Sequence, residues 1–228
     1  MALPRIKRTL PVRASGEQFE NPKSEWQCSR RVIASIFGQL HRLRVLDLGN
    51  NNIEDRFPHW LDALEKLQVL VLRGNKLQGF IPCRSHAFHM LRVLDLSSNN
   101  LKGPLPVSFF KSFKAMRRLD GKIGLQYLNY ANYSYDGGFY EDSIEVTFKG
   151  YEIHRQKILT VFTSIDLSNK MFEGEIPQTI EEFHALKGLN FSHNGLTGLI
   201  PVSIGNLRNL EWLDLSSNNF TGRIPRVD

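Results

Sequence analysis

The side chains that first suggest a chemical role are Cys83, His86 and His89, which follow one another at intervals of three residues. Thiolate and imidazole groups at this spacing are similar to zinc ligands, but a structural zinc ion takes four ligands and the local sequence supplies no fourth. We therefore expect neither a metal ion nor another cofactor. Cys28 is the only other cysteine, so a Cys28–Cys83 disulfide stays open for a chain that enters an oxidising compartment.

A second set of chemical groups is a series of aspartates that recur along the chain: Asp47, Asp95, Asp166 and Asp214. Neighbouring carboxylates can support acid–base chemistry or bind calcium. Their regular recurrence instead favours a repeated, solvent-facing position. The chain also has no G-x-S-x-G, no glycine-rich phosphate loop and no H-E-x-x-H motif. We therefore expect that the protein is not an enzyme.

The charge distribution argues against a nucleic-acid partner. The formal net charge is +6, from 29 Lys and Arg against 23 Asp and Glu, and residues 1–42 carry +5 of it. A phosphate-binding surface needs a concentrated basic face, which the nearly neutral remainder lacks. The longest uncharged stretch, residues 188–207, is too polar to span a bilayer, and the first residues have no apolar signal core. We expect no signal peptide and no transmembrane helix in this chain.

The elements that position these groups come from an internal repeat. The template L-x-x-L-x-L-x-x-N recurs at a spacing of 24 residues, with starts at Leu43, Leu67, Leu91, Phe162, Leu186 and Leu210. One repeat cannot bury its leucines alone, so neighbouring coils must stack and form a parallel sheet. The sequence thus predicts an α/β-type repeat solenoid built of leucine-rich repeats.

The repeat sets the expected strands and their faces. Strands should begin at Val45, Val69, Val93, Ser164, Gly188 and Trp212, with the next residues, Leu46, Leu70, Leu94, Ile165, Leu189 and Leu213, pointing inward. The third and fifth template positions should then face solvent. The template Asn closes the turn with an amide that donates and accepts. In the fourth coil Lys170 replaces it, so either that turn is looser or Asn169 substitutes after a shift of one residue.

An insertion interrupts the repeats. We divide the chain into a divergent segment (1–32), repeats (33–114), an insertion (115–161) and further repeats that stop without a cap (162–228). Within the insertion, alternating apolar residues in 144–148, a Lys149-Gly150 turn and a further apolar alternation in 151–153 predict a β-hairpin. The coil that begins at Phe162 should stack directly on the coil that begins at Leu91.

The x-L-x-G-x-I-P extension behind each Asn looks like the plant-specific class of leucine-rich repeat. Residues 45–79, 91–106 and 140–177 further resemble plant receptor-like proteins, the Cf-type cell-surface immune receptors without a kinase domain. That resemblance implies an island domain at the insertion and a place on the extracellular side of the plasma membrane. It also implies a protein or peptide ligand, a co-receptor kinase and an adaptor receptor-like kinase, in defence or developmental signalling.

The candidate binding residues lie in the insertion and on the concave sheet. Tyrosines are favoured at interfaces, and an exposed Trp beside small residues makes a plausible hot spot. The alternative for the tyrosines is that they pack the insertion onto the solenoid. The candidates are Tyr133, Tyr135, Tyr140, Ser164, Asp166, Asn190, Trp212 and Asp214. Three N-x-S/T sequons, at Asn132, Asn190 and Asn219, are candidate glycosylation sites in a secreted chain.

Two other functions stay open at this point. A soluble extracellular inhibitor, similar to the polygalacturonase-inhibiting repeat proteins, would use the same solenoid but has no insertion. A truncated gene copy without function would account for ends that appear cut.

Overall fold

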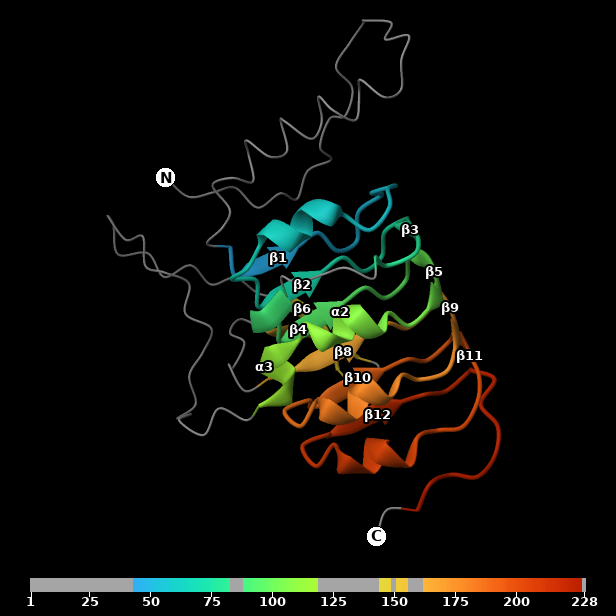
Figure 1. Ribbon diagram of the computed structural model, residues 1–228. Coiled ribbons are helices and arrows are strands. Elements are labelled where there is room, and N and C mark those ends of the chain that lie inside the picture. Colours follow the sequence, from blue (N-terminus) through green and yellow to red (C-terminus); the bar gives the residue numbers. More distant parts are fainter. Residues whose placement is uncertain (1–42, 83–87, 119–143, 149–150, 156–161, 227–228) are drawn as a thin grey trace, which may run out of the picture.

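The computed structural model describes residues 43–82, 88–118, 144–148, 151–155 and 162–226 (Figure 1). Six three-residue strands form one parallel sheet, in the order β1 (Val45–Asp47), β2 (Val69–Val71), β4 (Val93–Asp95), β8 (Ser164–Asp166), β10 (Gly188–Asn190) and β12 (Trp212–Asp214). Each strand begins at the predicted residue, and the coils stack from β1 to β12 in the order of the sequence. The predicted leucine-rich repeat solenoid is confirmed.

The central residue of each strand points into the solenoid, as predicted. The side chains of Leu46, Leu70, Leu94, Ile165 and Leu189 are buried in one core. Leu213 is the exception, with 41% of its side-chain surface exposed. It has the same orientation, but β12 is the last strand of the sheet, so no further coil covers it. Leu70, Leu94, Ile165 and Leu189 are buried by a neighbouring strand on each side, whereas Leu46, on the other edge strand β1, is 9% exposed.

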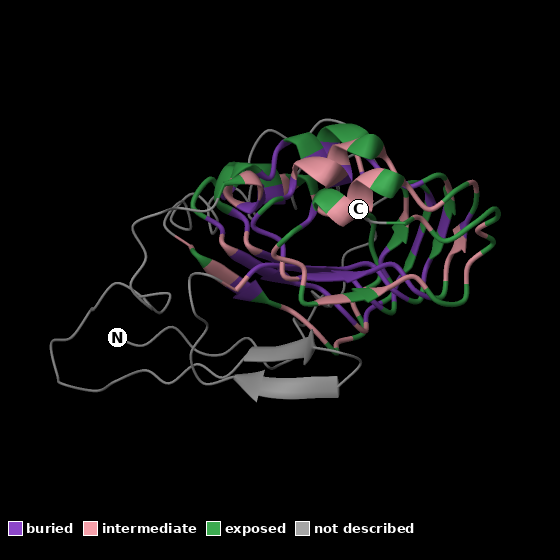
Figure 2. Cartoon of the chain, turned by 90° about the horizontal axis from the view of Figure 1, so that it is seen from below, coloured by how far each residue is buried: buried purple, intermediate pink, exposed green. Residues whose placement is uncertain are grey.

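A second layer and a series of short helices complete each coil. The second sheet has the order β11 (Gly195–Leu196), β9 (Met171–Gly174), β5 (Asn100–Pro104) and β3 (Gln78–Gly79). The return path carries the 3-10 helices η2 (His59–Ala63), η3 (Phe88–Met90), η4 (Gln178–Glu182) and η5 (Val202–Asn206), and the helices α2 (Val107–Lys111) and α3 (Lys114–Arg117). Figure 2 shows that buried residues are concentrated in the strands of the six-stranded sheet, whereas the outer helices and turns are largely exposed or intermediate.

An asparagine ladder joins successive coils. The Asn99 amide donates to the carbonyl oxygens of Leu96, in its own coil, and Leu72, in the preceding coil, at 2.9 Å each. Its Oδ1 accepts the Leu77 N–H at 3.0 Å. Equivalent bonds are made by Asn75, Asn194 and Asn218. The template Asn thus satisfies backbone groups that the turn leaves unpaired.

Lys170 breaks this ladder without shifting the register. Asn169 has a φ of 53°, as Asn50 and Ser98 do immediately before their ladder asparagines. Asn169 therefore occupies the left-handed position of the turn and does not replace the ladder Asn. An ammonium group has no acceptor, so Lys170 cannot accept the N–H of Leu101, the counterpart of Leu77. Of the two alternatives in the sequence, the unshifted turn is the one found.

Replacing Lys170 by asparagine should restore the ladder. At pH 8, where an amine with a pKa of about 7 is mostly neutral, we expect K170N to raise the free energy of unfolding by roughly 1–3 kcal/mol. The gain comes from new bonds to backbone groups between the third and fourth coils. Urea unfolding measures it, with exposed Lys102→Asn as the control. An unchanged or lower stability of K170N would contradict the ladder explanation.

The coils on either side of residues 119–161 are direct neighbours. β4 and β8 pair in parallel, with Leu94 opposite Ile165, although 68 residues separate Asp95 from Ser164. On the helical side, Phe113 packs on Phe183 with ring centroids 6.1 Å apart. The Ala185 N–H also donates to the Met116 carbonyl oxygen at 2.9 Å. The predicted stacking of the Phe162 coil on the Leu91 coil is confirmed.

Between these coils the chain also forms an antiparallel hairpin. β6 (Ile144–Phe148) pairs with β7 (Tyr151–Arg155), and Val146 lies opposite Ile153. The other predictions for this part of the chain, and those for the start, lie outside the described residues. They concern residues 1–42, Cys83, His86, Asn132, Tyr133, Tyr135 and Tyr140.

Candidate interaction surface

The middle of the concave sheet is buried, although the third and fifth template positions were predicted to face solvent. Val69, Val71 and Val93 pack together as a second apolar cluster, with Val45 and Phe162 against it. The candidate residues Ser164, Asp166 and Asn190 are also buried. Each is flanked in register by counterparts on two neighbouring strands. Their predicted exposure to solvent is therefore wrong.

Hydrogen bonds within the sheet explain why polar side chains are stable in these buried positions. Asp166 Oδ1 accepts the Ser168 N–H at 2.9 Å, and Asp166 Oδ2 accepts the Asn190 amide at 3.1 Å. Asn190 Oδ1 in turn accepts the Ser192 N–H at 3.0 Å and the Ser192 hydroxyl at 2.8 Å. Buried polar groups are tolerated when they are bonded in this way. These side chains therefore serve the sheet.

Three of the buried groups on and beside β4 and β8 can carry charge. Burial and the neighbouring Asp166 carboxylate raise the pKa of Asp95 to about 6, against smaller opposing effects of Ser97 and Arg73. Burial likewise raises the pKa of Asp166, although hydrogen bonds from Ser168 and Asn190 oppose it. Burial lowers the pKa of Lys170 to about 7, against the attraction of both carboxylates. Asp95 Oδ2 and Lys170 Nζ are buried atoms without a hydrogen-bond partner.

Among the described strands, the concave sheet is accessible at both ends, at β1, where Asp47 is exposed and Val45 partly exposed, and at β12, where two candidate residues lie. Trp212 is half-buried there, and its indole lies over Gly188, where any Cβ would collide with the ring. Asp214 is partly exposed, and its Oδ1 accepts the Ser216 N–H at 3.0 Å and hydroxyl at 2.7 Å. Of the described candidates, only Trp212 and Asp214 thus stay open to a partner. The structure brings them together at positions 1 and 3 of one strand.

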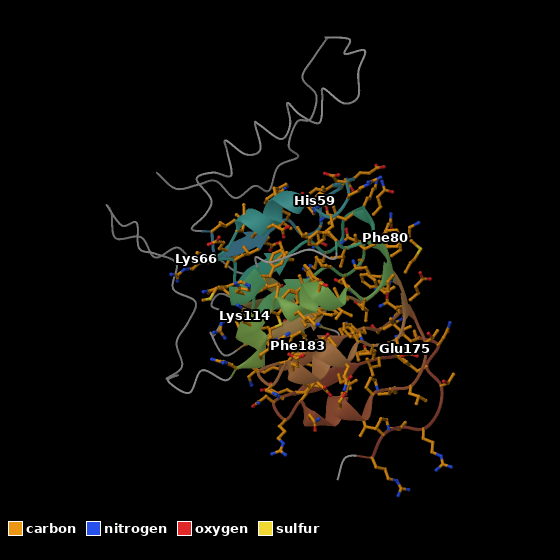
Figure 3. The ribbon with its side chains drawn as sticks, in the orientation of Figure 1. His59, Lys66, Phe80, Lys114, Glu175 and Phe183 are labelled. Atoms are coloured by element: carbon orange, nitrogen blue, oxygen red, sulfur yellow. The ribbon has the colours of Figure 1, made fainter. Side chains whose placement is uncertain are left out.

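The flank of the solenoid carries exposed apolar residues that the sequence did not single out. Phe80, Met171 and Leu199 are each more than half exposed and lie on or beside the second sheet. Figure 3 shows Phe80 on this flank, with Glu175 further along it. Phe80 and Leu199 follow the turn glycines Gly79 and Gly198, and that position is the sequence signal that could have found them. Single exposed apolar residues are common on protein surfaces, so we assign them no site.

The two described sequons differ in accessibility. The Asn219 side chain is exposed, as predicted. Asn190 was predicted to face solvent, but it is only 5% exposed and its amide is bonded to Asp166. A glycan on Asn190 would have to break that bond and open the sheet.

Within the described ranges, no group of three or more His, Cys, Asp or Glu side chains is arranged to hold a metal ion. Over the same residues, none of the helices combines the length and apolar character needed to cross a membrane.

Comparison with known proteins supports the repeat and its class. Models of the leucine-rich repeat match residues 31–77, 90–112 and 162–220, which is more than half of the chain. Receptor-like protein 34 of Arabidopsis thaliana is 44% identical over 148 residues, which cover 63% of this chain and 15% of that protein. The chain spans less than a fifth of the length of such relatives. The resemblance to plant receptor-like proteins is confirmed.

Solved structures give the same result for the fold. The plant peptide hormone receptor RGFR1, in complex with RGF2, is 26% identical with a TM-score of 0.59, and the match covers 83% of this chain and 23% of that one. The ectodomain of the Arabidopsis receptor kinase HAESA, in complex with an IDA peptide hormone, is 25% identical with a TM-score of 0.58, over 82% of this chain and 23% of that one. Together with the stacked parallel coils and the asparagine ladder, the repeat models show that the chain belongs to the leucine-rich repeat family, and the relatives show that it resembles plant receptor-like proteins.

Proposed function

We propose that this chain is a non-enzymatic interaction module of a plant cell-surface receptor. It binds a protein or peptide ligand on the extracellular side and joins a leucine-rich-repeat co-receptor kinase, with an adaptor receptor-like kinase as a further partner. In this proposal the repeats extend to α3 (Lys114–Arg117), whose Met116 is buried in the core, and not only to residue 114 as predicted. Residues 162–228 supply the later repeats, and the segment between the two blocks forms the island. Its signalling serves defence or development, by resemblance to the plant receptor-like proteins.

The observation that carries the proposal is the pair of accessible side chains on the concave face of β12, Trp212 and Asp214. A Trp held over a glycine keeps one rigid apolar face, and Asp214 beside it adds a charge and acceptor oxygens. Aromatic anchors of this kind dominate binding energy at protein interfaces because they bury a large area at small entropic cost. The likeness to ectodomains whose structures hold peptide hormones supports a peptide or protein as the partner.

Replacing Trp212 by alanine should weaken co-receptor binding. We expect an affinity loss of about 30-fold or more, which is the effect of removing a hot-spot residue worth about 2 kcal/mol. The measurement is biolayer interferometry with the whole chain and immobilised ectodomains of Arabidopsis leucine-rich-repeat co-receptor kinases, one at a time.

Phe80→Ala is the matched control, since it removes an exposed aromatic ring from the flank and leaves β12 unchanged. Circular dichroism must show that both variants keep the fold. If no co-receptor ectodomain binds the chain, the proposed partner is wrong. If W212A and F80A bind equally well, the partner is kept and the β12 surface is rejected.

A further inference from the structure

The parallel register places two buried carboxyl groups opposite each other at the joint between the third and fourth coils. Asp95 on β4 and Asp166 on β8 are paired residues of neighbouring strands, and they are 2% and 4% exposed. Side chains at paired positions lie close enough to interact directly. Two ionised carboxylates at paired positions, buried away from water, repel each other strongly.

The hydrogen bonds of the pair leave one oxygen with nothing to accept. Asp95 Oδ1 accepts the N–H and the hydroxyl of Ser97, at 3.0 and 2.6 Å. Both oxygens of Asp166 already accept a donor, from Ser168 and Asn190. Asp95 Oδ2 alone is buried without a partner. A proton on this oxygen would turn an unsatisfied acceptor into a donor that faces Asp166.

Asn190 shows that the sheet accepts this arrangement. It occupies the same repeat position as Asp95, on the opposite side of Asp166. Its Oδ1 binds the serine two residues later, and its Nδ2 donates to Asp166. A protonated Asp95 would repeat this pattern from β4, with its hydroxyl in place of the amide.

We propose that at mildly acidic pH the Asp95 carboxyl group is protonated on Oδ2 and donates a hydrogen bond to the Asp166 carboxylate. The contact between β4 and β8 is then sensitive to pH. Among the described residues, the charged groups that face the pair are Arg73, which follows β2, and Lys170, which follows β8. Asp47 and Asp214 lie two strands away on either side. Arg73 and Lys170 oppose proton uptake, but burial and carboxylate repulsion act more strongly on Asp95.

The direction of the pH effect follows from proton binding. Because the pKa of Asp95 is about 6 in the folded chain and ordinarily 3.8, the folded chain holds this proton between pH 4 and 6 while the unfolded chain has released it. Stability therefore falls as the pH rises through this window. Above pH 7 the folded chain has released a proton from Lys170 that the unfolded chain keeps. The contribution of Lys170 therefore makes stability rise with pH in this range. Stability should be lowest between about pH 6 and 7.

The test is urea unfolding of the whole chain between pH 4 and 7. We expect the folding equilibrium constant to fall by up to about tenfold per pH unit as the pH rises from 4 to 6. D95N keeps a neutral donor at all pH values and should lose part of this fall, and D95N/D166N should lose most of it. Leu213→Ala, which removes an apolar side chain at the edge strand and no titratable group, should keep the pH dependence of the unchanged chain.

Infrared spectroscopy provides a readout that a merely structural role would not change. At about pH 5.5, the unchanged chain should show the band of a protonated carboxyl group, and D95N should have lost it. If that band is absent from the unchanged chain, or if D95N keeps the full pH dependence, the shared proton is refuted.

Discussion

Replacing Phe113 by alanine is expected to lower the free energy of unfolding by about 3–5 kcal/mol. Phe113 is fully buried and contacts four other rings, with centroids 4.9 Å from Phe109, 5.9 Å from Phe110, 6.1 Å from Phe183 and 6.3 Å from Phe88. The loss combines the transfer of a large apolar side chain to water with the cavity that the other rings cannot fill. Most of the contacts are edge-to-face, a geometry that adds stability beyond the buried area.

Urea unfolding followed by circular dichroism measures this loss. Phe80→Ala is the control, because Phe80 is 64% exposed and its removal should change stability by about 0.5 kcal/mol or less. Phe183 belongs to the coil that follows the insertion and Phe113 to the coil that precedes it. A loss below about 1 kcal/mol for F113A would mean that the ring cluster does not hold these coils together.

Replacing Leu94 by alanine should cost about 2–5 kcal/mol. Leu94 is fully buried at the centre of β4, between Leu70 of β2 and Ile165 of β8. Leu213→Ala, at the same repeat position on the edge strand, should cost clearly less because its side chain is already 41% exposed. Thermal unfolding of both variants measures the difference. Equal losses of stability in the two variants would show that a neighbouring strand on each side does not determine how much an inward leucine contributes to stability.

The strands of the solenoid could be predicted from the sequence because the leucine period fixes both their position and their inward face. Leu94 and Ile165 were placed correctly although an insertion separates them. Burial on the other face could not be predicted in the same way. The alternation along a strand predicts the direction in which the side chain of Val69 or Asp166 points. It does not predict that Val69 is buried in an apolar cluster, or that Asp166 is buried and hydrogen-bonded.

The candidate site was predictable only in part for the same reason. Trp212 and Asp214 stay accessible because β12 is the edge of the sheet, whereas Asn190, two residues into β10, is enclosed by strands on both sides. The effect of Lys170 on the turn also could not be predicted from the sequence, which left two alternatives open. Only the left-handed backbone of Asn169 shows that the turn kept its register and that the ladder was broken.

The coils before and after residues 119–161 form one continuous solenoid, which ends at β12 with Trp212 and Asp214. A double-mutant cycle of Leu94→Ala and Ile165→Val tests it most directly, because these residues are paired across the joint. We expect an interaction energy of at least about 0.5 kcal/mol in urea unfolding, as for residues in contact. Effects that add to within about 0.3 kcal/mol, with two separate unfolding transitions, would contradict it.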